Sequence, residues 1–138
     1  MNIDSIKNGI VIDHIEAGKG MEIYNLLKLD TLGCSVAIIK NASSNKMGKK
    51  DIIKVDAKID LDMDILGFVS PSATVDIIRD GVLIEKKKIT LPEKLVNVIY
   101  CKNPRCISST EQELPHIFNL TNKESREYRC IYCETKGE

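Results

Sequence analysis

The chain has 138 residues, of which 43% are hydrophobic and 29% are charged, proportions typical of globular proteins. Its 20 Lys and Arg residues balance its 20 Asp and Glu residues, and it has no Trp, so we expect neither nucleic acid nor a membrane as a partner. No apolar run approaches the roughly 20 residues of a membrane-spanning helix, and the first residues, MNIDSIKNG, lack the apolar region of a secretory signal. We therefore expect a cytoplasmic protein with one core, or with one domain and a small appendage.

Runs of β-branched and apolar residues bounded by Gly, Asn or Asp predict strands in the first two thirds of the chain. The predicted strands span residues 9–15, 34–40, 51–57, 73–79 and 82–89. Apolar residues at helical spacing predict helices over residues 21–29 and 61–68, and the Asn- and Ser-rich residues 41–50 are typical of a loop. Asp80-Gly81, between two strand patterns, is a strong hairpin signal.

The order of these elements is strand, helix, strand, strand, helix, strand, with one added strand. It predicts an α+β fold of the ferredoxin-like, split βαβ type, in which an antiparallel sheet carries both helices on one face. Pro92 interrupts the pattern, so we expect a boundary there between a domain of residues 1–92 and a small β domain of residues 93–138. Residues 96–100 are expected to form a strand that leads into the first pair of cysteines.

Four of the five cysteines lie in the small second domain, as Cys101-x₄-Cys106 and Cys130-x₂-Cys133. So short a domain is rarely stabilised by apolar burial alone, and four thiolates on two turns suit one structural Zn²⁺. Two disulfides would need an oxidising compartment, which nothing else in the sequence suggests. A redox CIYC motif would be expected to follow a buried strand, whereas the polar residues NKESREYR precede Cys130. Four protein thiolates leave no position for water, so a catalytic zinc is not expected.

Two further residues could be confused with ligands. His116 lies between the cysteine pairs, and we interpret it as a surface or core residue because four cysteines already complete the site. Cys34 stands alone at the start of an apolar strand, and we interpret it as a small buried hydrophobe.

Several segments together resemble a known family. The segments NGIVIDHI, MGKKDIIKV, SATVDII and LPEKLVNVIYC occur in this order, followed by the rest of the cysteine set. The combination is similar to the regulatory chain of aspartate carbamoyltransferase over nearly the whole sequence. The resemblance implies a non-catalytic chain with an N-terminal domain that binds the effectors CTP and ATP, and sometimes UTP. It also implies a zinc domain that contacts the catalytic chain, and a self-dimer formed through the N-terminal domain, within the enzyme complex of pyrimidine biosynthesis.

The same resemblance implies an effector site on the sheet of the first domain. In it the nucleotide base would lie near Ile6, Val11 and Gly81, the ribose near Asp13 and Lys54, and the phosphates near His14, Lys50 and Lys86. These roles are chemically sensible, since a carboxylate accepts hydrogen bonds from hydroxyl groups and Lys suits a flexible polyphosphate. The chain departs from the family pattern at two positions. Asp76 stands where Asn is frequent and would repel phosphate, and Gly81 stands where a bulkier residue is frequent, so effector preference is expected to differ.

Other interpretations remain at this point. Without the resemblance, Lys50, Lys54 and Lys86 could be solvated lysines that protect strand edges. Asp13 and His14 are not expected to act as a catalytic pair, because neighbouring residues of a strand point to opposite faces. A zinc-ribbon module for nucleic acid would explain the cysteines but not the balanced charge. A small enzyme is disfavoured by the lack of a nucleophile motif.

Overall fold

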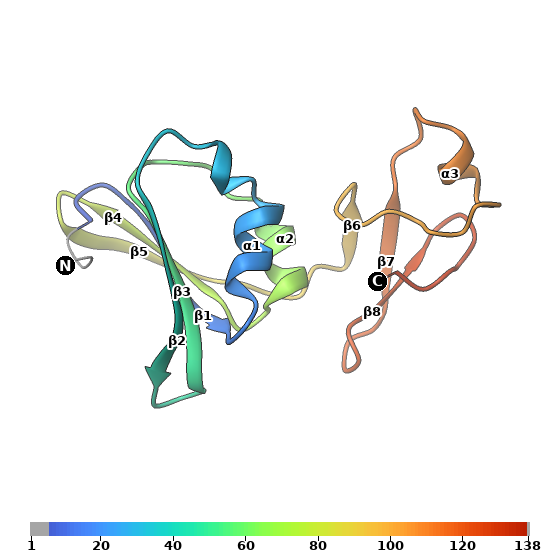
Figure 1. Ribbon diagram of the computed structural model, residues 1–138. Helices are drawn as coiled ribbons and strands as arrows, with labels where there is room; N and C mark the ends of the chain where they lie inside the picture. The colour runs from blue at the N-terminus through green and yellow to red at the C-terminus, as the bar shows by residue number, and fades with distance from the viewer. Residues whose placement is uncertain (1–5, 138) are drawn as a thin grey trace. The chain divides into compact units, whose positions relative to one another are not determined.

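The computed structural model describes residues 6–137 (Figure 1) and divides the chain into two units, Met1–Thr90 and Leu91–Glu138. The boundary between the units therefore follows residue 90, two residues before the boundary expected after residue 92. Within residues 6–137, no helix is both long enough and apolar enough to cross a membrane.

The first unit contains a five-stranded sheet in the order β2-β3-β1-β4-β5, with every neighbouring pair antiparallel. Its strands are β1 (Gly9–Glu16), β2 (Val36–Ser44), β3 (Gly48–Val55), β4 (Thr74–Arg79) and β5 (Val82–Lys88). The helices α1 (Gly20–Leu26) and α2 (Met63–Val69) lie on the same side of this sheet (Figure 1). The predicted ferredoxin-like fold is confirmed, with β5 added beside β4.

Alternation along the strands explains why the helices cover one face only. Ile10, Ile12 and Val75 are buried, as are Ile53 and Val55 of β3, and these residues form one core with inward residues of both helices. The residues between them point to the opposite side, which neither α1 nor α2 covers. We call this second side the open face.

Two bulges interrupt the alternation beside β3. In β1, Ile12 and Ile15 are both fully buried, so the two residues between them, Asp13 and His14, lie on the open-face side of the strand. The β1–β3 register shifts at this point, and His14 has a φ of 56°, as expected for a bulge. A second shift occurs in β2, where Asn41 has a φ of 59°.

The buried carboxylate of Asp51 connects this part of the sheet to the start of α1. Its Oδ2 accepts hydrogen bonds from the backbone N–H groups of Gly18 at 3.0 Å and Gly20 at 2.9 Å, and its Oδ1 accepts one from Asn41 at 3.0 Å. A Cβ atom at Gly20 would lie 2.9 Å from Oδ2, so glycine permits the close approach. Asp51 therefore connects the β1–α1 loop to the bulge in β2.

Three sequence predictions need correction. Residues 41–50 are not a loop, because β2 and β3 continue to a short turn at residues 45–47 and Ser43 and Ser44 pair with Lys49 and Gly48. The first helix ends at Leu26, and a 3₁₀ turn, η1 (Leu29–Thr31), follows a left-handed Lys28. Residues 97–100 are not part of a strand, because the strand at this place spans residues 94–96.

The second unit contains a three-stranded antiparallel sheet in the order β6-β7-β8. Its elements are β6 (Lys94–Val96), α3 (Ile107–Thr110), β7 (Ile117–Asn122) and β8 (Glu127–Cys130). After β6 the chain turns at Asn97, which has a φ of 57°, and its side chain accepts a hydrogen bond from the His116 backbone. Apart from cysteines, the buried apolar core is small and consists of Leu95, Phe118 and Tyr128.

Candidate metal centre and open face

The four predicted cysteine ligands converge at one point in the second unit. Their four sulfur atoms all lie within 4.8 Å of one another. Among the described residues, these cysteines form the one cluster of three or more metal-ligand side chains. Sγ of Cys101 lies 3.6 Å from Sγ of Cys133, and Sγ of Cys106 lies 3.7 Å from Sγ of Cys130. Tetrahedral zinc with Zn–S bonds of about 2.3 Å separates its sulfur ligands by about 3.8 Å. The arrangement fits a four-coordinate metal centre.

Local hydrogen bonds shape the two turns that carry the cysteines. In the first turn, the Cys106 N–H donates to the Asn103 carbonyl at 3.0 Å, and the Ser109 hydroxyl donates to the same carbonyl at 2.8 Å. In the second, the Glu134 N–H donates to the Cys130 carbonyl at 2.9 Å. These bonds fix the backbone of each turn, although the neighbouring elements α3 and β8 have only four residues each.

Hydroxyl groups next to the sulfurs favour thiolates at two of the four positions. Hydrogen bonds from the Thr135 hydroxyl and backbone N–H lower the pKa of Cys133 to about 6. Burial raises the pKa of Cys106, but the Ser108 hydroxyl, 3.0 Å from its Sγ, and the Ser108 N–H lower it by more. Burial raises the pKa of Cys101 to about 12. A bound cation would supply the positive charge that a thiolate at Cys101 requires.

His116 and Cys34 both lie outside the metal centre. His116 Nδ1 accepts a hydrogen bond from the Cys101 backbone N–H at 3.2 Å, and its ring packs edge-on against Tyr100. His116 therefore positions a ligand rather than acting as one. Cys34 is half-buried against the core of the first unit, rather than fully buried as expected.

The predicted effector residues of the first unit gather on the open face. Lys54, Val11, Asp76 and Lys86 are consecutive partners across β3, β1, β4 and β5, with Ala37 of β2 at the end of the row. Val11 and Asp76 are half-buried at the centre, and Lys86 is exposed at the edge. The row therefore has an apolar and acidic centre with a lysine on either side.

Asp13, His14 and Lys50 form a second group beside this row. Lys50 Nζ lies 3.0 Å from Asp13 Oδ1. The His14 N–H donates to the same carboxylate oxygen at 2.6 Å, and its ring Nδ1 lies 3.1 Å from Thr74 Oγ1. Partial burial raises the pKa of Asp13, but Lys50 and the His14 N–H lower it by more, to below the ordinary 3.8.

The expectation that Asp13 and His14 point to opposite faces is wrong. The bulge turns both side chains away from the core, so that His14 reaches Thr74, the cross-strand partner of Asp13. Among the described side chains, the only one hydrogen-bonded to the His14 ring is the Thr74 hydroxyl. The group offers a carboxylate, an imidazole and an ammonium group to a ligand.

Asp76 carries an unsatisfied acceptor. Its Oδ1 is buried, and no described group donates a hydrogen bond to it. Burying an acceptor without a donor is costly, so such atoms often mark a place where a ligand, water or ion binds. On the neighbouring strand β5, Lys86 is the cross-strand partner of Asp76.

Ile6 and Gly81 lie at the end of β1 where the β4–β5 hairpin turns. The Gly81 N–H donates to the Lys7 carbonyl at 2.9 Å, and a Cβ atom at Gly9 would meet the Ile6 side chain. Asp80 and Gly81 both have positive φ, which confirms the hairpin turn predicted from the sequence. This end of the sheet is therefore held by contacts between residues 7–8 and the hairpin.

Sequence reasoning missed Ser108, Thr135 and Asp51. Ser108 and Thr135 each lie two residues after a cysteine ligand, a spacing that could have indicated hydrogen bonds to sulfur. Nothing in the local sequence distinguishes Asp51 from other aspartates at the start of a strand.

Comparison with known proteins covers both units. A family model described as "Aspartate carbamoyltransferase regulatory chain, allosteric domain" matches residues 1–90, and one described as "Aspartate carbamoyltransferase regulatory chain, metal binding domain" matches residues 93–138. An aspartate carbamoyltransferase regulatory chain from Clostridium tetani is 51% identical over 135 residues, covering 97% of this chain and 94% of the relative. One from Bifidobacterium longum is 45% identical over 138 residues, covering 100% and 99%.

Proposed function

The chain belongs to the family of aspartate carbamoyltransferase regulatory chains, and on that premise we propose that it binds nucleoside triphosphates on its open face and controls a catalytic chain. It is a non-catalytic chain with an allosteric and a metal-binding domain. The observation that carries the effector proposal is the row of Lys54, Val11, Asp76 and Lys86, with Asp13, His14 and Lys50 beside it.

The chemistry of the open face suits CTP or ATP. Half-buried Val11 offers an apolar surface to a base, and the Asp13 carboxylate can accept hydrogen bonds from ribose hydroxyls. Lys50, Lys54 and Lys86 supply the positive charge that a triphosphate requires, and the His14 imidazole can hydrogen-bond to a phosphate oxygen. The unsatisfied Oδ1 of Asp76 suits an N–H or O–H group of the ligand, or Mg²⁺ bound with it.

The ion of the metal-binding domain is Zn²⁺ in this proposal. Four thiolates at tetrahedral spacing match structural zinc. Because they fill all four coordination positions of the ion, no position is left for a substrate. When bound, the ion would hold the two cysteine turns together and add directly to the folding free energy of a unit whose apolar core is small. Free thiolate ligands require reducing conditions, which agrees with a location in the cytoplasm.

The surface around the metal turns is where the catalytic chain would bind. Tyr100, Ile107, Ile131 and Tyr132 are exposed, and each is the immediate sequence neighbour of a cysteine ligand. Exposed aromatic and aliphatic residues on a rigid turn are typical anchors of protein interfaces. Their position means that metal binding would order the catalytic-chain interface itself.

Self-association would occur through the first unit. β2 and β5 are the outer strands of its sheet, and β5 exposes Val82, Leu83 and Ile84. An exposed apolar edge strand is a natural place for pairing with a second chain. A dimer of this kind would let two effector sites act on the same assembly, through a coupling free energy between ligand and quaternary state.

One reconstitution tests the proposal. The zinc-loaded chain is mixed with the catalytic chain of aspartate carbamoyltransferase, and assembly and carbamoyltransferase activity are measured with and without CTP and ATP. We expect a stable complex whose activity responds to a nucleotide. Lys54→Gln should weaken that response, while Lys49→Gln, which changes an exposed lysine of the same strand outside the row, should preserve it. Assembly without any nucleotide response in the unmodified chain would contradict the effector role.

A further inference from the structure

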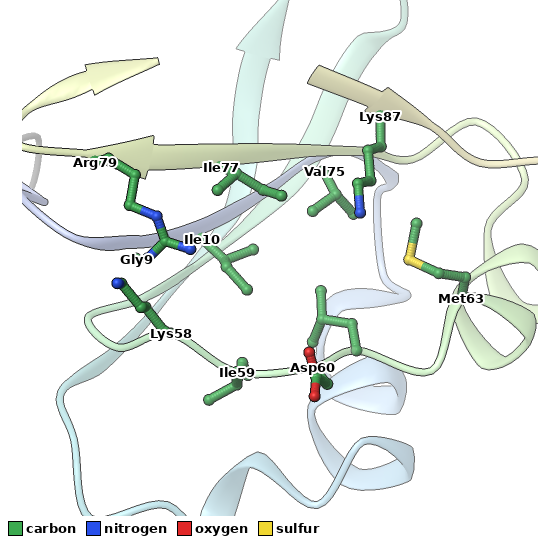
Figure 2. A pocket seen from close by; sticks show the side chains of 11 residues that line it. Gly9, Ile10, Lys58, Ile59, Asp60, Met63, Val75, Ile77, Arg79 and Lys87 are labelled. Atoms are coloured by element: carbon green, nitrogen blue, oxygen red, sulfur yellow. The ribbon is translucent and has the colours of Figure 1, made fainter. Parts of the chain in front are cut away.

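A cavity of about 280 Å³ lies on the helix side of the sheet, away from the open face. The helix α1 packs on β2 and β3, whereas the β1–β4–β5 end is covered by the segment of residues 58–63. Figure 2 shows this segment crossing opposite the strands, with the cavity between them. None of the predicted effector residues lines it.

The floor of the cavity is apolar. Ile10 and Val75 are buried core residues of adjacent strands, and Ile77 is half-buried beside them. Met63 extends toward this floor from the covering segment (Figure 2), and Ile59 of the same segment also lines the cavity. An aromatic ring or a branched aliphatic group would find apolar contacts on both sides.

Three cations surround this apolar floor. Arg79 comes from β4, Lys87 from β5 and Lys58 from the covering segment, and Arg79 and Lys58 extend toward the same end of the cavity, near Gly9 (Figure 2). Asp60 is the one acidic residue in the lining. Within residues 6–137, none of these four side chains forms a salt bridge. The cavity therefore has excess positive charge that the described residues do not neutralise.

Arg79 occupies an unusual position. Val75, Ile77 and Arg79 alternate along β4, so the Arg side chain points to the core side of the sheet, where apolar residues are expected. As a residue, Arg79 is half-buried. A planar guanidinium with no partner carboxylate can donate two parallel hydrogen bonds to a carboxylate or phosphate group.

We propose that this cavity is a second small-molecule site that binds a small organic oxyanion with an apolar body. Arg79 and Lys58 hold the carboxylate or phosphate group, and Ile10, Val75 and Ile77 contact the body. The volume lies just below the usual range of about 300–1,000 Å³ for ligand sites, so a single ring or a short branched chain fits better than a nucleotide. Because Val75 and Asp76 are neighbours on β4, the two sites would use opposite faces of one strand.

An NMR titration of the full zinc-loaded chain tests the site with four probes. Phenyl phosphate and benzoate carry both the anion and the ring, inorganic phosphate carries the anion alone, and benzyl alcohol carries the ring alone. We expect saturable shifts of amide signals from residues 58–61 and 75–79 with phenyl phosphate or benzoate. Inorganic phosphate and benzyl alcohol should each bind at least about tenfold more weakly. Whichever of the two ring-bearing probes binds more tightly identifies the preferred oxyanion.

Matched variants separate this site from the open face. Arg79→Gln should weaken binding about tenfold, and Arg79→Lys should weaken it less, since charge is kept but the paired donors are lost. Lys87→Gln should weaken binding, while Lys86→Gln, the next residue on the same exposed strand, should not. The amide spectrum of each variant shows whether it is folded.

Three outcomes would overturn the proposal. These are the lack of saturable binding by either ring-bearing probe, equal binding of inorganic phosphate, and binding that Arg79→Gln leaves unchanged. CTP binding is measured on the same variants. Because Arg79 and Lys87 lie outside the proposed effector residues, failure of this second site would leave the effector proposal unaffected.

Discussion

The Lys50 ammonium group lies 3.0 Å from the Asp13 carboxylate, and their side chains are only 17% and 21% exposed. Two residues expected to meet different parts of a nucleotide thus neutralise one another in the ligand-free chain. A triphosphate that approaches Lys50 must share it with Asp13 or replace Asp13 as its partner. The pair consequently sets part of the free-energy cost of effector binding.

The Asp13–Lys50 pair should contribute to stability in a pH-dependent way. The pKa of Asp13 in the folded chain lies below its ordinary value, so the pair stabilises the fold above about pH 4. This contribution is lost as the pH falls through the lowered pKa, when the carboxylate takes up a proton. Asp13→Asn should therefore reduce stability near neutral pH and flatten its decline in acid.

Urea unfolding at several pH values measures this effect. Asp56→Asn is the control, because Asp56 is an exposed aspartate of the same sheet region. If Asp13→Asn and the unmodified chain lost stability in parallel below about pH 4, the pair would have no role in acid stability.

Asp51→Asn should be among the most damaging substitutions in the first unit. The Asp51 carboxylate is buried and accepts three backbone N–H groups, whereas an amide can present only one oxygen to them. Hydrogen bonds to a charged group are worth about 1.5–3 kcal/mol each, so we expect a loss of about 3 kcal/mol in unfolding free energy.

The matched comparison is Asp62→Asn. Asp62 also accepts two backbone N–H groups, at the N-terminus of α2, but it is exposed and Asn is an equally good cap. Its unfolding free energy should change by less than about 0.5 kcal/mol. Equal effects at the two positions would show that the burial of Asp51 is not what makes it important.

Removal of the metal should unfold the second unit and spare the first. The second unit has few buried apolar residues, and its four cysteines lie on turns rather than on paired strands, apart from Cys130 at the end of β8. With a chelator present, amide signals of residues 93–138 should lose their dispersion while those of the five-stranded sheet remain. Cys106→Ser should have the same effect without a chelator, and Cys34→Ser should keep the metal. Retained dispersion throughout the chain would contradict a structural metal.

Thr135→Val should weaken metal affinity about 10- to 100-fold, the range typical of residues that hydrogen-bond to a metal ligand. Thr135 Oγ1 lies 3.2 Å from Sγ of Cys133, and valine keeps the shape without the hydroxyl. Competition with a coloured zinc chelator measures the change. Thr110→Val is the control, because its hydroxyl donates to the Ile107 carbonyl and not to a sulfur. An unchanged metal affinity in Thr135→Val would show that the Thr135 hydroxyl does not contribute to metal binding.

Asp76→Asn should tighten CTP binding when Mg²⁺ is absent, by about three- to tenfold, because a carboxylate that repels phosphate is removed. Mg²⁺ should reduce the difference, since a bound cation already screens Asp76. Calorimetric titration with CTP and ATP, with and without Mg²⁺, tests both statements. Tight CTP binding that is indifferent to the substitution would show that Asp76 does not face the phosphates.

Local patterns predicted much of the fold. Alternating apolar residues gave the correct strand positions around Ile12 and Ile53, and the Asp80-Gly81 turn defined the added hairpin. Residues 41–50 were expected to form a loop because they are rich in Asn and Ser. They extend β2 and β3 instead, because residues 42–44 pair with residues 48–50, and this pairing outweighs their low strand propensity. The strand expected at residues 96–100 fails because Asn97 adopts a left-handed conformation and bonds to His116, a partner distant in the sequence.

The candidate sites were predictable to different depths. Cysteine spacing alone indicated the metal centre, because two short motifs carry all four ligands. By contrast, the Asp13–Lys50 contact and the three bonds of Asp51 join residues from different elements, and they follow from the fold rather than from any motif. The shared orientation of Asp13 and His14 violates the two-residue period, which is the rule that sequence reasoning must apply to a strand.

The bulge at Asp13 and His14 amounts to a single additional residue in β1. Loss of one codon there would restore regular alternation from Ile10 through Ile12 to Ile15, so the apolar side of the strand would still meet both helices. The open face, however, would keep one polar side chain in place of two. In evolutionary terms, a lineage could thus gain or lose a ligand-binding group by one insertion or deletion, with no compensating substitution in the core.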